Sequence, residues 1–171
     1  MVSFKTLVAV SSIFVVVGAA TLHEEPEKTL DFSSDNIEYS PPCVQLYALL
    51  EKYSAEYDIP FEIAIGVASE ETGYHGPFHW SYDPKQVSYA NAYGAMQIQV
   101  PTANDNWDER VTAKMLLNDL DLNVHISMKL LSRLKRKYGS WRVALGVYNS
   151  GRPIVNDYAI RIASGKSNPL K

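Results

Sequence analysis

Apolar residues recur every three or four positions along most of the chain from residue 43 onward. This spacing places apolar side chains on one face of a helix, so that each segment packs against a shared core. Pro60, Gly73 and Gly139 interrupt the pattern where helices begin or end. The pattern predicts helices over residues 43–57, 61–72, 111–118, 121–138, 140–149 and 153–163, the last from the register of Ile154, Val155, Tyr158 and Ile162.

Strand signals are weak, and only residues 89–99 are expected to contain a short hairpin. The predicted class is therefore mainly α. The helical part of the chain is long enough to enclose one core. No internal repeat or low-complexity segment is visible in the sequence.

Glu71 stands at the end of an apolar stripe in the second predicted helix. Ala64, Val67, Ala68 and Glu71 follow one another at the i, i+3, i+4, i+7 spacing of a core-facing surface. A carboxyl group moved toward an apolar environment has its pKa raised, because burial penalises the ionised form. An acid that stays protonated near neutral pH donates a proton to a leaving group. Glu71 is therefore a candidate general acid.

Two alternatives to this interpretation stay open from the helical pattern alone. Glu70 lies about 100° further round the helix, and it would face the site if the inward surface is instead formed by Ile63, Gly66, Val67 and Glu70. The other alternative is an ordinary pair of solvated glutamates near a helix end, since charged residues are mostly exposed. The choice depends on motifs elsewhere in the chain.

Three short motifs follow one another along the chain. Residues 71–74 read Glu-Thr-Gly-Tyr, residues 94–98 read Gly-Ala-Met-Gln-Ile, and residues 148–151 read Tyr-Asn-Ser-Gly. In this order they resemble the catalytic domain of soluble lytic transglycosylases, over residues 43–165. That family has a Glu followed by Ser and then an aromatic residue, a Gly-Leu-Met-Gln segment and an Ala-Tyr-Asn segment. The resemblance implies a lysozyme-like α+β fold, with helices around a glycan-binding cleft and at most a short hairpin.

The chain departs from the family pattern at several positions. Thr72 replaces Ser but keeps a hydroxyl group, Ala95 replaces Leu, and Val147 stands where Ala is common. None of these changes removes a group capable of chemistry. Residues 73–93 are long for the family and rich in aromatic side chains, and they either line a sugar cleft or form a packed surface loop.

The resemblance implies cleavage of peptidoglycan at the β-1,4 bond between N-acetylmuramic acid and N-acetylglucosamine. Most glycosidases use two carboxylates for such a reaction. In this family one glutamate suffices, because the N-acetyl group of the substrate assists and the same glutamate then activates the 6-hydroxyl group of the sugar. The product carries a 1,6-anhydromuramoyl end. Asp83, Asp105 and Asp108 fall outside the motifs and are interpreted as ordinary loop residues.

The resemblance also assigns roles within the motifs. Glu71 is the combined acid and base. Tyr148 shares a helical stripe with Ala144 and Leu145, from which its hydroxyl group would reach and position Glu71. Gly94 is expected to let the backbone approach the substrate closely. The expected substrate-binding residues are Thr72, Gly94, Met96, Gln97 and Asn149.

Other functions remain as alternatives. A hydrolase of the same fold would cut the same bond with water, and a wall-binding module would keep the fold without turnover. A zinc site formed by Glu71, His75 and His79 is not expected, because the Gly-Pro pair at 76–77 should break the helix between the two histidines. We therefore predict neither a metal nor a cofactor.

The N-terminal residues indicate where this chemistry takes place. Residues 1–20 combine an early lysine, an apolar run and small residues at 18–20, which is the composition of a secretory signal peptide. The run is short for a membrane span of about 20 apolar residues, and an uncleaved anchor is the alternative. Residues 21–42 are interpreted as a flexible acidic linker, and residues 166–171 as a C-terminal tail. We expect export to the periplasm or the extracellular space.

Charge and cysteine content narrow the choice of partners. The formal net charge is −3 and most of the excess acid lies in the predicted linker, which gives no reason to expect a nucleic-acid partner. The expected partner is the peptidoglycan glycan strand, and service to an envelope-spanning machine stays open. Cys43 is the only cysteine, so no disulfide forms within the chain. No oligomerisation signal is visible, and a monomer is the default expectation.

Overall fold

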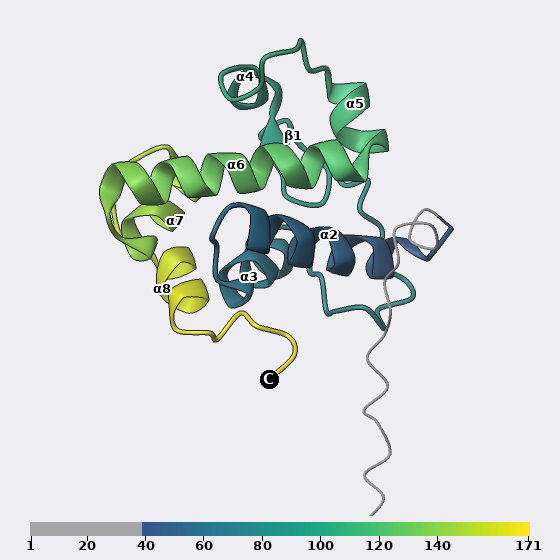
Figure 1. Cartoon of the computed structure of the whole chain (residues 1–171), viewed down its shortest axis with the longest axis horizontal. Helices are drawn as coiled ribbons and strands as arrows, with labels where there is room; N and C mark the ends of the chain where they lie inside the picture. Colours follow the sequence, from purple (N-terminus) through teal and green to yellow (C-terminus); the bar gives the residue numbers. More distant parts are fainter. Residues whose placement is uncertain (1–38) are drawn as a thin grey trace, which may run out of the picture. The chain divides into compact units, whose positions relative to one another are not determined.

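The computed structural model describes residues 39–171, which form a mainly helical domain with one small hairpin (Figure 1). The predicted signal peptide, 1–20, and most of the predicted linker, 21–42, lie outside the described residues. The elements in chain order are α2 (Pro42–Glu56), α3 (Phe61–Thr72), β1 (Ala92–Tyr93), β2 (Ile98–Gln99), α4 (Val100–Asn104), α5 (Ala113–Asn118), α6 (Leu120–Tyr138), α7 (Trp141–Ser150) and α8 (Asp157–Ala163).

The hairpin lies within the segment where the sequence predicts one. β1 and β2 pair in antiparallel register, with Ala92 opposite Gln99 and Tyr93 opposite Ile98. The other elements of the described part are helices, so the predicted mainly α class with a short hairpin is confirmed. Among residues 39–171, no helix is both long and apolar enough to cross a bilayer.

Apart from the last helix, the helix boundaries lie within two residues of the predicted ones. α3 spans the predicted residues, and α2 and α6 each start one residue earlier than predicted. α8 begins only at Asp157, because Asn156 caps it by accepting a hydrogen bond from the Ala159 amide. Ile154 and Val155 are exposed in the preceding loop. Their predicted place in this helix is wrong. The apolar spacing extends toward the N-terminus past Asn156, but the helix itself starts only after this capping residue. The short α4 was not predicted at all.

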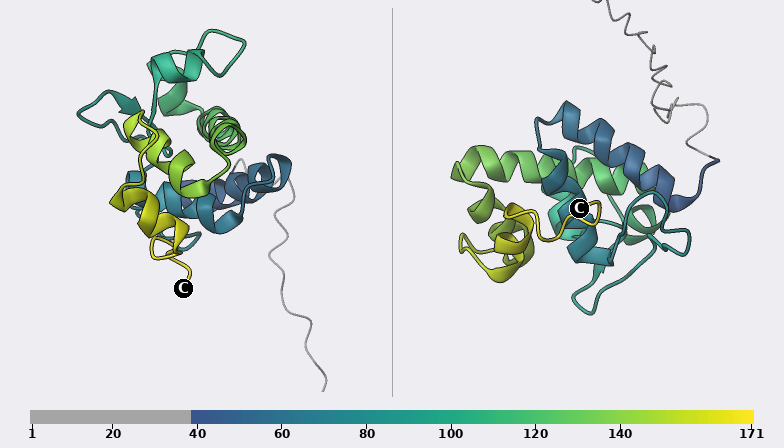
Figure 2. Two further views of the ribbon diagram at one scale, coloured as in Figure 1. Left: turned by 90° about the vertical axis from the view of Figure 1, so that its left-hand side faces the viewer. Right: turned by 90° about the horizontal axis from the view of Figure 1, so that it is seen from below.

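α6 is the central helix of the fold. α2 and α7 pack against α6, and α8 packs against both α7 and α3. In a view along α6, α4 and α5 lie on one side of this helix, and α2 and α3 on the other (Figure 2). Asn123 of α6 fixes the hairpin, because its side chain accepts a hydrogen bond from the Met96 amide and donates one to the Tyr93 carbonyl.

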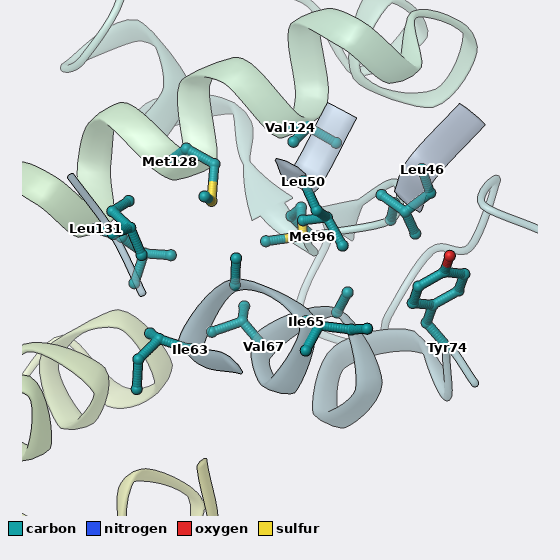
Figure 3. Close-up of a cluster of buried hydrophobic side chains, with 14 of the residues drawn as sticks. Leu46, Leu50, Ile63, Ile65, Val67, Tyr74, Met96, Val124, Met128 and Leu131 are labelled. Carbon is teal, nitrogen blue, oxygen red and sulfur yellow. The ribbon is translucent and has the colours of Figure 1, made fainter. Parts of the chain in front are cut away.

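The main core surrounds α3. Residues 63–68 of this helix are all buried, so that α3 is covered nearly all round. Ile65 and Val67 belong to the same buried cluster as Met96 of the hairpin connection and Met128 of α6 (Figure 3). Protein interiors are close-packed, and a helix held on all sides has little room to shift. The core therefore fixes the position of the last turn of α3.

Cys43 is buried in the first turn of α2. Its thiol donates a hydrogen bond to the Pro77 carbonyl at 3.3 Å, and its carbonyl accepts one from the Tyr74 hydroxyl group at 2.6 Å. These two contacts join the start of α2 to the segment that follows α3.

Candidate active site

A cleft of about 720 Å³ opens beside the last turn of α3. Its walls come from the hairpin and from α4, α6 and α7. Of the seven residues that the sequence assigns to the site, four line this cleft: Glu71, Gln97, Tyr148 and Asn149. The other three, Thr72, Gly94 and Met96, are buried and do not line it.

Glu71 lies in the last turn of α3, where the helix meets the cleft. Its Oε1 accepts a hydrogen bond of 2.6 Å from the hydroxyl group of Tyr158 in α8. Burial raises the pKa of Glu71 from its usual 4.5 to about 7; the Tyr158 hydrogen bond opposes this shift and the charge of Glu70 adds to it. A large share of Glu71 therefore keeps its proton at neutral pH.

Glu70 precedes Glu71 but points to a different side of α3. Its carboxylate accepts two hydrogen bonds from Arg161 of α8, at 2.8 Å from Nε and 2.6 Å from Nη2, and another from Ser167. The bonded guanidinium group holds the pKa of Glu70 below its usual value, against the effect of partial burial. Glu70 does not line the cleft, so it is Glu71 that meets the site.

The tyrosine that contacts Glu71 is Tyr158 rather than Tyr148. Tyr148 lines the cleft, but its hydroxyl group donates to the Met96 carbonyl at 2.7 Å. Burial, and then the charge of Glu71, raise the pKa of both tyrosines, so both remain protonated donors at neutral pH. Sequence reasoning missed Tyr158 because its register with Ile162 reads as an ordinary core stripe.

The second motif forms the tight connection between β1 and β2. Gly94 and Gln97 have positive φ values of 80° and 49°. The Gln97 side chain closes the turn by donating to the Gly94 carbonyl at 2.9 Å and to the Gln86 carbonyl at 3.1 Å. A Cβ atom at position 94 would lie 2.3 Å from Nδ2 of Asn123. The glycine therefore permits close approach of α6, and the expected close approach of a substrate stays a prediction.

Thr72 and Met96 support the site from the interior. The Thr72 hydroxyl group donates to the Ala95 carbonyl at 3.0 Å and lies 2.8 Å from the Tyr82 hydroxyl group. Met96 is fully buried in the core with α3. Thr72 thus ties the last turn of α3 to the second motif. Direct substrate binding by either residue stays a prediction.

The three motifs thus converge on one cleft, and the whole domain has known relatives. A family model described as the transglycosylase SLT domain matches residues 49–168. The chain belongs to the transglycosylase SLT domain family. No curated protein matches the sequence.

Solved structures share the fold of this SLT domain. One is the 70 kDa soluble lytic transglycosylase Slt70 of Escherichia coli, with 23% sequence identity and a TM-score of 0.51. Another is the complex of the 70 kDa soluble lytic transglycosylase with bulgecin A, with 23% identity and a TM-score of 0.52. Each match covers 72% of this chain but only 18% of the matched chain. The predicted lysozyme-like fold, with helices around a cleft, is confirmed.

Amide and charged side chains of the SLT domain complete the cleft lining. Asn149 lines it, with its Oδ1 accepting a hydrogen bond of 2.9 Å from Asn156. Gln99, Asp105 and Arg133 line it as well. Gln99 and Arg133 were missed because they lie outside the motifs, and Asp105 was interpreted as an ordinary loop residue for the same reason.

The aromatic segment that follows α3 in the SLT domain divides into buried and exposed parts. Tyr82 is buried against Thr72, whereas Phe78 and Trp80 are 69% and 64% exposed. Ser88 and Ala90, near the end of the segment, line the cleft. The segment therefore packs through Tyr82 and borders the cleft through Ser88 and Ala90, and none of its aromatic side chains lines the cleft.

A metal-binding arrangement is not seen in the described part of the SLT domain. Among residues 39–171, no group of three or more His, Cys, Asp or Glu side chains is placed to hold a metal ion. His75 and His79 contact each other, with ring centroids 5.1 Å apart, in the loop after α3.

Proposed function

We propose that this chain is a peptidoglycan lytic transglycosylase. It cleaves the β-1,4 bond between N-acetylmuramic acid and N-acetylglucosamine and leaves a 1,6-anhydromuramoyl product, with Glu71 as the single general acid and base. The observation that carries the proposal is the raised pKa of Glu71, about 7, at the wall of a cleft lined by amide side chains. Membership of the SLT family supports the same activity.

The proposed reaction moves one proton away from Glu71 and one back. Protonated Glu71 donates its proton to the bridging oxygen as the bond from that oxygen to the anomeric carbon breaks. The 6-hydroxyl oxygen then attacks the anomeric carbon, and its proton passes to the Glu71 carboxylate. Glu71 ends as it began, and no water is consumed. A pKa near neutrality suits both halves of this cycle, because the group must act first as acid and then as base.

Amide groups along the cleft suit an N-acetylated glycan. Gln99 and Asn149 both donate and accept hydrogen bonds, which matches sugar hydroxyl and N-acetyl groups. The Gln97 amide is already held by the hairpin, so we expect it to offer mainly its oxygen to a ligand. Tyr158 donates to the Glu71 carboxyl group and would hold it in one orientation through the cycle.

Hydrolysis by water is the second candidate, and one observation favours it. Asp105 lines the same cleft as Glu71, and an inverting hydrolase needs a second carboxylate across the cleft to activate water. From its place outside the three motifs alone, Asp105 is expected to be an ordinary loop residue. The two candidates differ in their products and in the importance of Asp105.

Digestion of purified peptidoglycan sacculi by the full chain tests the proposal. Mass spectrometry of the released fragments is expected to show anhydro ends, which are lighter than reducing ends by one water. Glu71→Gln is expected to release almost nothing, and Asp105→Asn to release nearly as much as the wild type. Reducing ends together with an inactive Asp105→Asn would establish the hydrolase instead. Binding to sacculi without release by the wild-type chain would indicate a wall-binding module.

The proposed activity also requires export, because peptidoglycan lies outside the cytoplasmic membrane. The signal-peptide composition of residues 1–20 supports a periplasmic or extracellular location, with an uncleaved anchor as the alternative. Fractionation of the producing cells, followed by N-terminal sequencing of the recovered protein, distinguishes cleavage from anchoring. Retention of the intact chain in the cytosol would contradict this part of the proposal. Co-purification from envelope fractions tests for an envelope-spanning machine.

A further inference from the structure

Two adjacent residues of α3 hold the same short helix. Glu71 accepts a hydrogen bond from Tyr158, and Glu70 accepts a two-pronged pair of bonds from Arg161. Tyr158 and Arg161 stand three positions apart in α8, which places them on neighbouring parts of one helix face. The contact with the proposed catalytic acid and the ion pair therefore belong to one junction between α3 and α8.

We infer that Glu70, Arg161 and Ser167 form a positioning device, which holds α8 at the rotation where the Tyr158 hydroxyl group meets Glu71. This inference rests on the proposed function, because it concerns how the proposed acid is kept in place. Glu70 and Arg161 act through Tyr158, and neither is a catalytic residue.

The apolar contacts of α8 with α3 are few, and we expect them to hold the two helices close without fixing the rotation of α8 alone. α8 has only seven residues, and Tyr158, Ala159 and Ile162 are its buried ones. A Cβ atom at Gly66 would lie 3.0 Å from Cγ2 of Ile162, so the two helices approach closely at that point. Hydrophobic contact is non-directional. A bidentate arginine–carboxylate pair, in contrast, has a fixed geometry, and it supplies the direction that the apolar contact lacks.

The exposure of the pair favours this role over a role in stability. The Arg161 side chain is 47% exposed and that of Glu70 is 17% exposed. Ion pairs open to solvent contribute little to the stability of a fold. Ser167, in the segment after α8, is nevertheless buried and gives its hydroxyl hydrogen to Glu70. The chain after the helix thus folds back to complete a contact whose main effect is geometric.

The groups that face Glu71 make the role measurable. Tyr158 of α8 and Tyr148 of α7 face it, and Glu70 is its charged neighbour on α3. The Tyr158 hydrogen bond lowers the pKa of Glu71 and the charge of Glu70 raises it. Removing Arg161 frees Tyr158 to leave Glu71 and also leaves the charge of Glu70 unpaired. Both effects raise the pKa of Glu71.

A double-mutant cycle in the full chain tests the inference. We expect Arg161→Met to lower kcat/KM for sacculus digestion about fivefold, as small displacements of catalytic groups do. If Arg161 acts through Tyr158, adding Arg161→Met to Tyr158→Phe lowers kcat/KM no further. Lys166→Met is the matched control, since it removes an exposed cation from the same segment without touching Glu70, and it should digest sacculi like the wild type.

Titration of Glu71 by carbon NMR gives a readout that does not need turnover. Arg161→Met should raise the pKa of Glu71, Arg161→Lys should raise it less, and Lys166→Met should leave it unchanged. If Arg161→Met does not fold, Ser167→Ala removes one bond to Glu70 and should shift the same pKa upward by less. An unchanged pKa in a folded Arg161→Met chain, or effects that multiply in the double variant, would overturn the inference.

Failure of the inference and failure of the proposed function give different results. If Glu71→Gln digests sacculi as fast as the wild type, the proposed role of Glu71 is wrong, while the titration still shows whether Arg161 acts on Glu71. If Glu71→Gln is inactive and the titration shows no effect of Arg161, the proposed function is supported and the inferred positioning role of Arg161 is wrong.

Discussion

Glu70 and Glu71 share one turn of α3, but their surroundings shift their pKa values in opposite directions. Glu71 faces the cleft, where burial raises its pKa to about 7. Glu70 faces Arg161 and Ser167, and hydrogen bonding to the guanidinium group lowers its pKa. The same type of side chain therefore keeps a proton near neutral pH on one side of the helix and forms an ion pair on the other. A rotation of about 100° separates the two roles.

The largest expected contrast is in activity. Glu71→Gln removes the transferable proton, and we expect kcat/KM for sacculus digestion to fall by about 10²- to 10⁴-fold. Glu70→Gln keeps an oxygen that accepts a bond from Arg161, and it should retain activity within about tenfold of the wild type. Release of fragments from sacculi measures both variants. Equal losses in the two variants would remove the distinction between the two sides of α3.

The free energy of unfolding should depend on pH in opposite ways for the two glutamates. The folded state raises the pKa of Glu71, so its stabilising effect is complete below its usual value of 4.5 and is lost as the pH rises through about 7. Glu71→Gln has no such loss, and it should exceed the wild type in unfolding free energy at alkaline pH by about 3 kcal/mol. Urea unfolding on both sides of this range measures the difference.

Glu70 serves as the control for that measurement. Its pKa is lowered in the fold, so its contribution is present above its usual pKa and is lost as the pH falls. Glu70→Gln should therefore destabilise the chain at neutral pH, where Glu71→Gln does not. Destabilisation by Glu71→Gln at alkaline pH would contradict burial as the cause of the raised pKa.

Removal of the Tyr158 hydroxyl group should make Glu71 still harder to ionise. The hydrogen bond from Tyr158 favours the ionised form, so Tyr158→Phe raises the pKa of Glu71. The fall of kcat/KM with rising pH, which we expect near pH 7 in the wild type, should move to higher pH. Loss of this hydrogen bond should also lower the highest kcat/KM in the pH profile about tenfold. Tyr148→Phe is the matched control, since its hydroxyl group bonds Met96 and should leave the midpoint nearly unchanged.

The smallest expected effect is a shift of the fall in kcat/KM toward lower pH, opposite to the shift expected for Tyr158→Phe. Glu70→Gln removes the negative charge that helps to keep Glu71 protonated, so the fall of kcat/KM should begin at lower pH than in the wild type. A pH profile identical to that of the wild type would show that the two carboxylates do not interact.

The helical register identified Glu71 as a residue that faces inward, but it could not separate Glu71 from Glu70. Both stripes of α3 are buried, because this helix is covered on nearly all sides. What separates the two glutamates is the partner that each meets in α8, more than 80 residues further along the chain. No local pattern contains that information.

The helices themselves were largely predictable, because their amphipathic faces and terminal glycines are local features. The start of α8 was not, since the cap at Asn156 overrides the apolar register of Ile154 and Val155. Tyr158 was missed for a related reason. Its place among apolar neighbours is that of a core residue, and its hydroxyl group meets Glu71 only because α3 ends beside it.

The only thiol of the chain, Cys43, is 1% exposed at the start of α2. Because no disulfide has to form within the chain, production of the protein does not depend on oxidising conditions. A water-soluble thiol reagent reaches Cys43 only when the surrounding structure opens, so its labelling rate reports how often that happens. The protein therefore contains its own site for reporting unfolding, with which every variant described above can be ranked without introducing another cysteine.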